Sequence, residues 1–449
     1  MGGPQPTVKS FEINKRLVYV AWERVRANQG APGVDTVSIT GFADHEQANL
    51  LKLWNRMSSG SYLPGPVRAV EIPKDHGAGV RVLGVPNVAD RIAQTAAAML
   101  LEEKLEPIFH RDSYGYRPGR GALDALAVTR TRCWQQDWVV DLDIRAFFDS
   151  VPHDLLLKAV AHHTDERWVL LYIARWLTSP MRMPDGTLVA REKGTPQGSP
   201  ISPLLANVFM HYAFDRWMAR EHPGCPFERY ADDIVVHCDT EDQARALRAA
   251  IATRLQTVGL ELHPDKTKVA YCKDANRPGD AEHTSFDFLG YTFRARLAKG
   301  RRGYFASFSP AISGKARKAV GQKIRGWHLN RRSGTDLSGL AVEINPQVRG
   351  LDQLLRGLLP LRAALRCQAH RRARRSMGHA EIQTTARQAR EGTSLAGSCS
   401  PASAPALRPL GTPLAHPRPA CGSRMTGDCH VRFCESRGVR FSPATHQAP

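Results

Sequence analysis

The chain has 449 residues, 42% of them hydrophobic, and its 62 Lys and Arg residues against 43 Asp and Glu residues give a net charge of +19. This length predicts two to four domains, and the charge favours a polyanionic partner such as nucleic acid. The sequence contains no run of about 18 apolar residues, no apolar segment typical of a secretory signal, and no regular spacing among its nine cysteines. We therefore expect a reduced, cytoplasmic protein without a membrane span.

The positive charge is unevenly distributed along the chain. Residues 351–449 contain 15 Arg, no Lys and only five acidic residues, for a net charge of +10. The same stretch lacks Trp and Tyr, contains five of the nine cysteines, and is rich in Pro, Ala and Ser without apolar periodicity. Such a composition predicts disorder. About half of the net positive charge therefore lies in a segment that is predicted to be disordered. That half gives no information about the partner of the folded region.

Before residue 350, helical and extended patterns alternate irregularly. The first helix has Leu17, Val20, Ala21 and Val25 on one face. Asn87 is a plausible helix cap, as is Asp239 or Thr240 further on. Helices are predicted at 14–30, 87–106, 153–163 and 241–258, and strands at 137–144 and 286–294. Because no regular βαβ repeat occurs, the predicted fold class is α+β.

Acidic residues lie at the end of the predicted strand 137–144. Side chains alternate along a strand, so Asp141 and Asp143 share one face while Val140, Leu142 and Ile144 point to the other. A carboxylate at the end of an apolar strand lies at the rim of a sheet. Alone, this is a weak indication of a site, because strand-end Asp residues are often solvated caps.

A second acidic pair lies in the segment FERYADDIVVHC, residues 227–238. Asp232 and Asp233 separate two β-prone stretches, which places them on a hairpin turn. If the Asp143 strand lies beside this hairpin, three carboxylates converge. Such groups repel one another unless a cation lies between them, and hard oxygen ligands suit Mg²⁺. A pair of Mg²⁺ ions is the arrangement used in phosphoryl or nucleotidyl transfer.

The segment GTPQGSPISP, residues 194–203, combines two glycines and three prolines. It predicts a tight, rigid turn followed by an apolar helix that contains Asn207. Exposed backbone that approaches a ligand closely is one reason for such glycines.

With these segments the chain resembles the reverse transcriptases encoded by bacterial group II introns, which also act as intron maturases. Val82 departs from the pattern, since the family more often has Pro there. The matching strings occur in the family's order; they are GAPGVD (30–35), IPKDHGAGVRVLGVPNVADRIAQ (72–94), DSYGYRPGRGALDAL (112–126), DLDIRAFFDSVPHDLL (141–156), GTPQGSPISPLLANV (194–208), RYADDIVV (229–236), GLELHPDKTK (259–268) and FDFLGYTF (286–293).

The resemblance implies a right-hand polymerase with fingers, palm and a truncated thumb, followed by the disordered tail. The implied division is an N-terminal extension (1–60), fingers (61–130), palm (131–300), the start of a thumb (301–350) and the tail (351–449).

The same resemblance assigns roles to individual residues. Asp143, Asp232 and Asp233 are the implied catalytic acids, which bind two Mg²⁺ ions. Phe148, or alternatively Phe147, is the implied aromatic residue that excludes a ribose 2′-OH. The implied nucleotide-binding residues are Lys74, Arg81, Phe148, Gln197 and Lys266, and the implied primer grip is Phe288, Leu289 and Gly290.

The implied partners are group II intron RNA, an RNA template, a DNA primer and dNTPs. Two alternatives remain open from the sequence. The chain could be an RNA-binding remnant without catalysis, or a reverse transcriptase of a retron or of a diversity-generating element. NPQVRG (345–350), which resembles the family's NPxIRGW string, favours the intron class.

The residues after 350 are consistent with a shifted reading frame. Residues 351–361 can be encoded so that loss of one base gives WINYYGAFYR, a string that suits the family's thumb. The same offset in residues 377–390 gives WAMRKYKRLRGKP. We therefore hypothesise one extra nucleotide near codon 350 or 351, which would also account for the missing Lys, Trp and Tyr.

Overall fold

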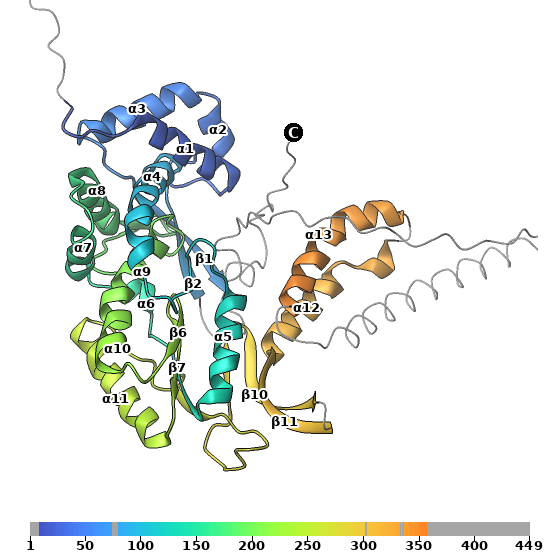
Figure 1. Ribbon diagram of the computed structural model, residues 1–449. Helices are drawn as coiled ribbons and strands as arrows, with labels where there is room; N and C mark the ends of the chain where they lie inside the picture. Colours follow the sequence, from blue (N-terminus) through green and yellow to red (C-terminus); the bar gives the residue numbers. More distant parts are fainter. Residues whose placement is uncertain (1–8, 74–79, 301–302, 333, 335, 357–449) are drawn as a thin grey trace, which may run out of the picture. The chain divides into compact units, whose positions relative to one another are not determined.

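The computed structural model describes residues 9–356 except 74–79, 301–302, 333 and 335 (Figure 1). These residues form two compact units that divide between residues 310 and 311, close to the boundary at 300/301 expected for the thumb. Lys74 and residues 357–449 lie outside the described residues, so the expected disorder of the tail is not tested there. Within the described part of the chain, no helix is both long and apolar enough to cross a membrane.

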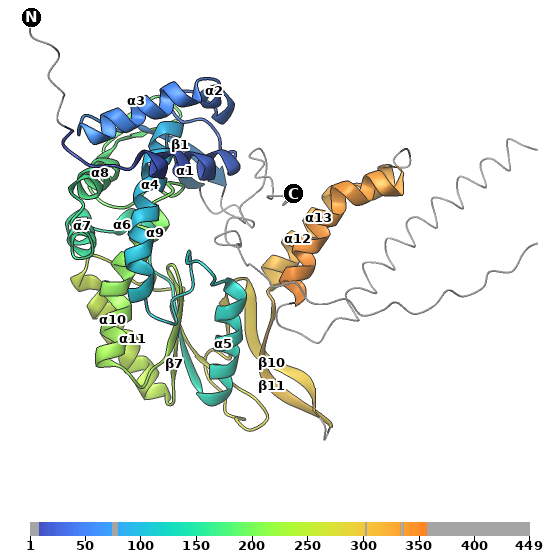
Figure 2. The same ribbon diagram turned by 45° about the horizontal axis from the view of Figure 1, so that its top comes forward.

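Two N-terminal helices of the first unit, α1 (Lys15–Ala27) and α3 (Glu46–Ser58), pack against one long helix, α4 (Val88–Leu105). The short helix α2 (Ile39–Ala43) packs against α3, and Figure 2 shows α1 lying across α4. The small side chains of Ala93, Ala96 and Ala97 are buried, which lets neighbouring helices approach α4 closely. The predicted N-terminal extension therefore shares the main apolar core.

The other helices of this core follow along the chain. The predicted helix 153–163 is α7, which begins after Pro152 as expected, and the predicted helix 241–258 is α11, capped by Thr240. The set comprises α6 (Phe147–Ser150), α7 (His153–Ala161), α8 (Arg167–Thr178), α9 (Ser202–Met210), α10 (Arg216–Glu221) and α11 (Glu241–Thr257). A π-helical turn, His211–Asp215, joins α9 to α10.

One four-stranded sheet has the order β2-β1-β4-β5. Its strands are β1 (Val67–Pro73), β2 (Val80–Val85), β4 (Met181–Arg182) and β5 (Leu188–Val189). The antiparallel pair β1–β2 is the larger part of this sheet, and β4 adds to β1 in parallel. Strands β1 and β2 fall in the range expected for the fingers, whereas β4 and β5 fall in the range expected for the palm.

A second, antiparallel sheet has the order β6-β7-β3-β8. Its strands are β3 (Trp138–Leu142), β6 (Phe227–Tyr230), β7 (Asp233–Cys238) and β8 (Lys268–Tyr271). The side chains of Val140, Leu142, Ile234 and Val236 on one face belong to the main core with those of α9 and α11. Helix α5 (Ala122–Gln135) packs on β6 and β7 (Figure 2).

The prediction of one strand at 286–294 is wrong. The structure has two antiparallel strands there, β9 (Ser285–Phe288) and β10 (Tyr291–Gly300), joined by a tight turn. Leu289 and Gly290 both have positive φ, 49° and 81°, which reverses the chain within an otherwise β-prone stretch. Strand β11 (Gly303–Ile312) completes this three-stranded sheet.

The described residues of the second unit include the α-helices α12 (Gly314–Gly326) and α13 (Leu337–Arg356). The Ser313 side chain caps α12 by accepting a hydrogen bond from the Ala316 amide at 3.1 Å. Trp327 at the end of α12 donates to Gln347 of α13 at 3.0 Å. Helix α13 continues past residue 350 to Arg356. The mixture of helices and antiparallel sheets across both units confirms the predicted α+β class.

Candidate active site

The strand that precedes Asp143 lies directly beside the acidic hairpin, as predicted. Strand β3 pairs antiparallel with β7, with Leu142 opposite Ile234. Both of these side chains are buried in the main core. Asp143 follows Leu142 and Asp233 precedes Ile234, so this pairing brings the two acids to one end of the sheet, on the face opposite that core.

The hairpin turn itself adopts a costly conformation. Tyr230 pairs with Asp233, so Ala231 and Asp232 form a two-residue turn, and Asp233 is the first residue of β7. Ala231 has φ +59°, in the left-handed region that residues other than glycine rarely occupy. Such strain persists only when the surrounding structure enforces it, and it is common at functional sites.

A glycine makes room for this turn. A Cβ atom built on Gly115 would lie 2.5 Å from the Ala231 amide nitrogen, closer than real contacts allow. The backbone at residues 114–115 therefore packs directly against the hairpin. This explains the glycine of the SYGYRPG string by packing within the protein.

The loop before β8 holds the backbone of Asp143 on both sides. The Asp143 amide donates to Thr267 Oγ1 at 3.4 Å, and the Asp143 carbonyl accepts from the His263 amide at 2.7 Å. Lys266 of the same loop places its Nζ 3.3 Å from Asp143 Oδ2. The structure thus puts Lys266, predicted to bind nucleotide, beside a predicted catalytic acid.

Negative charge accumulates at this end of the sheet. Burial raises the pKa of Asp141 well above its usual range, and repulsion from Asp233 raises it further, with smaller contributions from Asp287 and Asp143. Lys268 of β8, which lies opposite Asp141 in the sheet, lowers the pKa of Asp141. The arrangement therefore favours a bound cation, which would relieve the repulsion among these carboxylates.

These residues fit a divalent metal by donor type and charge. Asp143 and Asp233 offer hard carboxylate oxygens from neighbouring strand ends, and Asp232 is on the adjoining turn. In the part of the chain that the structure describes, no group of three or more His, Cys, Asp or Glu side chains is already arranged to hold a metal ion. The candidate ligands are thus brought together by the sheet, without a preformed coordination cage.

The glycines of GTPQGSPISP lie close to other segments of the chain itself. Gly198 has φ +109°, and a Cβ atom there would lie 2.7 Å from the Gly84 carbonyl oxygen. A Cβ atom on Gly194, φ +82°, would lie 2.7 Å from the Phe148 carbonyl oxygen. Within the described residues, these glycines therefore permit close approach to other backbone segments of the chain.

This loop also contacts β2, the strand that carries Arg81. The Gln197 carbonyl accepts a hydrogen bond from the Gly84 amide of β2 at 2.7 Å, and Gln197 is half-buried. On the same strand β2, Arg81 is exposed. Lys74 lies outside the described residues, so its expected position across the cleft is not tested.

The two adjacent phenylalanines differ in burial. Phe147 is 2% exposed and belongs to the main core, whereas Phe148 is only half-buried. The Phe148 carbonyl accepts from the Thr195 amide at 2.6 Å, which links this segment to the GTPQGSPISP loop. Phe148 is thus the ring of the two with surface to present to a nucleotide, and its role stays a prediction.

The predicted primer grip coincides with the β9–β10 turn. The Phe288 side chain is 2% exposed, whereas Leu289 is half-buried and Gly290 is exposed. Any contact with a primer would therefore come from Leu289 and the turn backbone, while Phe288 anchors the turn in the protein.

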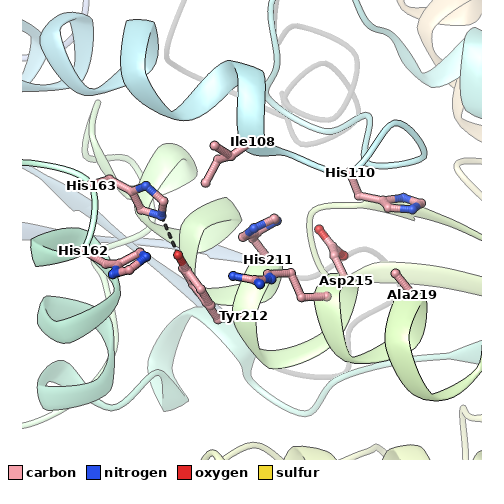
Figure 3. A pocket seen from close by; sticks show the side chains of 9 residues that line it. Ile108, His110, His162, His163, His211, Tyr212, Asp215 and Ala219 are labelled. Carbon is pink, nitrogen blue, oxygen red and sulfur yellow. Dashed lines mark hydrogen bonds between the residues drawn. The ribbon is translucent and has the colours of Figure 1, made fainter.

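Sequence reasoning missed a pocket lined by histidines, which Figure 3 shows. It has a volume of about 400 Å³, and its wall includes His162, His163 and His211. His163 Nε2 and the Tyr212 hydroxyl are 2.6 Å apart. Burial lowers the pKa of His211 to about 4. His211 is far along the chain from the adjacent His162 and His163, so only the helix packing could reveal this pocket.

The family model described as reverse transcriptase (RNA-dependent DNA polymerase) matches residues 72–293. Protein YkfC of Escherichia coli is 34% identical over 312 residues, covering 61% of this chain and 77% of YkfC.

Two further relatives match shorter stretches. The group II intron-encoded protein LtrA of Lactococcus lactis is 30% identical over 203 residues, which is 45% of this chain and 33% of LtrA. The retron Mx65 reverse transcriptase of Myxococcus xanthus is 31% identical over 209 residues, 44% of this chain and 46% of that protein. The chain thus spans less than half the length of these two relatives.

Proposed function

Because this chain belongs to the reverse transcriptase family, we propose that it is an RNA-directed DNA polymerase that copies group II intron RNA into DNA. The pairing of β3 with β7 carries the proposal, since it brings Asp143 and Asp233 together beside the Asp232 turn. The similarity to LtrA supports the intron class.

The three acids Asp143, Asp232 and Asp233 would hold two Mg²⁺ ions. Bound there, the ions would supply charge stabilisation to the attacking and leaving oxygens of an in-line nucleotidyl transfer. The protein's own contribution is to fix the acids. The sheet pairing and the contacts of His263 and Thr267 with the Asp143 backbone fix the first of them.

The incoming dNTP would bind between the β2-β1-β4-β5 sheet and the β6-β7-β3-β8 sheet. Lys74 and Arg81 would hold the triphosphate through charge-assisted hydrogen bonds, and Gln197 would position the nucleotide. Phe148 would exclude a 2′-OH. Lys266, held near Asp143 at 3.3 Å, would exchange that contact for a phosphate oxygen when nucleotide binds.

Template and primer would be the nucleic-acid partners of the same site. The β9–β10 turn at Leu289 and Gly290 would contact the primer, with Phe288 as its buried anchor. Intact relatives of this kind would also assist splicing of their intron, and the protein would act in a bacterial cytoplasm.

A shifted reading frame after residue 350 remains part of this proposal. Helix α13 includes the NPQVRG string and leaves Val342 78% exposed. An apolar residue exposed to this extent suits a helix whose packing partner is missing. In-frame thumb residues such as WINYYGAFYR would supply the aromatic side chains for such a partner.

An RNA-binding remnant without catalysis is the second candidate. The basic helix α12, with Lys315, Lys318 and Lys323 on it, would suffice for contacts with RNA phosphates. This reading requires no working acid cluster.

Primer extension on an RNA template separates the two candidates. The proposed polymerase should extend a DNA primer with dNTPs, and the Asp232→Ala chain should not. Equal and background-level extension by both chains, together with retained RNA binding, would favour the remnant. The exposed acid Asp242, on α11, offers a matched control as Asp242→Ala.

A further inference from the structure

A fully buried arginine lies two residues before the hairpin turn. Arg229 has 0% exposure, in a strand whose four residues are all buried. A buried guanidinium is costly unless all of its donors are satisfied. Register places Arg229 opposite Ile234, so its side chain points to the core face, away from the face that Asp143 and Asp233 share.

All five N–H donors of Arg229 have partners. Nε and Nη2 donate to the two carboxylate oxygens of Asp215, each at 2.7 Å. Nη2 also donates to Ser113 Oγ at 2.9 Å. Nη1 donates to Asn207 Oδ1 at 3.0 Å and to the Ala231 carbonyl oxygen at 3.1 Å. Asp215, Ser113 and Asn207 are themselves 0% exposed. We call Ser113, Asn207, Asp215 and Arg229 the Arg229 network.

Two hydrogen bonds of the Arg229 network bear directly on the turn. The Ala231 carbonyl belongs to the residue whose φ is +59°. Asn207 also donates from Nδ2 to the Gly115 carbonyl at 2.7 Å, and Gly115 is the residue that packs against the Ala231 amide. Arg229 therefore holds the carbonyl group of the strained turn. Asn207 fixes the Gly115 backbone, which packs against the Ala231 amide on the other side of the turn.

The π-helical turn brings the network together. In an α-helix, residues eight positions apart point about 80° away from each other. The wider π turn at 211–215 offsets this angle, so that Asp215 and Asn207 both contact Arg229. Single π turns inside helices are frequently associated with functional sites.

We propose that Arg229 and Asn207 are positioning residues, which hold the Ala231–Asp232 turn in the conformation that its carboxylate needs to bind metal. This inference rests on the proposed function, because it assigns the metal to the Asp143, Asp232 and Asp233 cluster. It concerns residues that touch neither nucleotide nor metal and act through the turn backbone.

The test compares variants of the network with a partly buried ion pair elsewhere. The network variants are Asn207→Ala, Ser113→Ala and Arg229→Lys. Arg277→Lys is the control, because Arg277 also forms an ion pair, with Asp274, in which the two side chains are 11% and 14% exposed, and it also donates to backbone carbonyls. Thermal unfolding first establishes which variants fold and how much stability each has lost.

Two readouts then separate positioning from stability. Mn²⁺ affinity, measured by electron paramagnetic resonance without substrate, should fall about tenfold in Asn207→Ala. The kcat of single-nucleotide extension should fall about 100-fold, as expected for a displaced reacting group, with the KM for dNTP and the affinity for RNA unchanged. Arg277→Lys should lose stability without either effect.

The outcomes are distinguishable from failure of the proposed function. If folded Asn207→Ala and Ser113→Ala match Arg277→Lys in Mn²⁺ affinity and kcat, the positioning role is overturned while polymerisation stands. If the native chain extends no primer, or Asp232→Asn leaves Mn²⁺ affinity unchanged, the proposed function fails instead. Should Arg229→Lys not fold, Ser113→Ala decides, because it removes one bond and leaves the ion pair intact.

Discussion

Lys266 and Asp143 form an ion pair at the end of the central sheet, with Nζ 3.3 Å from Oδ2. The pair is partly exposed, 60% for the lysine side chain and 36% for the aspartate. Exposed pairs of this kind contribute little to stability. Its significance is positional, because the same lysine can contact Asp143 or a bound phosphate.

The first prediction concerns this lysine. Lys266→Met should raise the KM for dNTPs about tenfold, since loss of one charge-assisted hydrogen bond costs about 1.5 kcal/mol or more. Steady-state extension kinetics measure the change. Lys273→Met is the control, as Lys273 also pairs with an acid, Asp280, elsewhere on the surface. An unchanged KM would mean that Lys266 serves Asp143 alone.

The second prediction separates chemistry from binding. Asp232→Asn should abolish nearly all polymerisation and leave RNA affinity intact, because the acid clamps metal whereas Lys and Arg contacts with phosphate hold the RNA. Extension assays and filter binding measure the two effects. Parallel loss of both would indicate that Asp232 supports the fold.

The third prediction concerns sugar selection. Phe148→Ala should reduce discrimination against ribonucleotides by about tenfold or more, in the range expected for one altered pocket contact. Competition between dNTP and rNTP incorporation measures it. Phe147→Ala should instead cost about 3–5 kcal/mol of stability, because that ring is buried in the core. Unchanged sugar discrimination in Phe148→Ala would move the assignment to Phe147.

The fourth prediction is a pH dependence of stability. Burial raises the pKa of Asp90 to about 6, above the value near 3.9 of an unfolded chain. The folded state therefore binds a proton at Asp90 more tightly than the unfolded chain does. The resulting stabilisation is present below about pH 4 and is lost as the pH rises through 6. The loss amounts to about 3 kcal/mol. Asp90→Asn should remove it, which urea unfolding between pH 4 and 7 would measure.

A second group acts in the opposite direction over the same range. Burial lowers the pKa of His211 to about 4, below an unfolded value near 6.5. Its contribution is present above pH 6.5 and is lost as the pH falls through 4, again by about 3 kcal/mol. The native chain should therefore show a shallow profile. The Asp90→Asn chain should lose stability as the pH falls, and the His211→Gln chain should lose stability as the pH rises. If neither substitution changed how stability depends on pH, both assignments would be contradicted.

The fifth prediction tests the reading frame. Removing one base near codon 350 should restore thumb sequence, raise soluble yield, and add RNA affinity with a steeper salt dependence from the recovered Lys residues. Sequencing the gene comes first, since the neighbouring frame must encode WINYYGAFYR. Slow hydrogen exchange across 391–449 in the present chain would reveal a folded domain there and contradict the frameshift account.

Local sequence was sufficient for much of this molecule. Alternation along 137–144 predicted β3, and Thr240, one of the two residues predicted to cap α11, is its cap. Short-range rules succeed here because side-chain periodicity and capping depend on neighbours within one helical turn or strand. The prediction of one strand at 286–294 failed because a β-prone stretch contains a two-residue turn. Phe288 pairs with Tyr291, and Leu289 leaves the β region to reverse the chain.

The three acids could be named from sequence because their motifs are local. The residues that hold the acidic turn in place could not be named in this way. Nothing local in the sequence around Arg229 indicates which groups satisfy its five donors. Its partners Ser113, Asn207 and Asp215 lie 116, 22 and 14 residues away. Whether a charge is buried and satisfied depends on which distant segments surround it, and that is decided by tertiary packing alone.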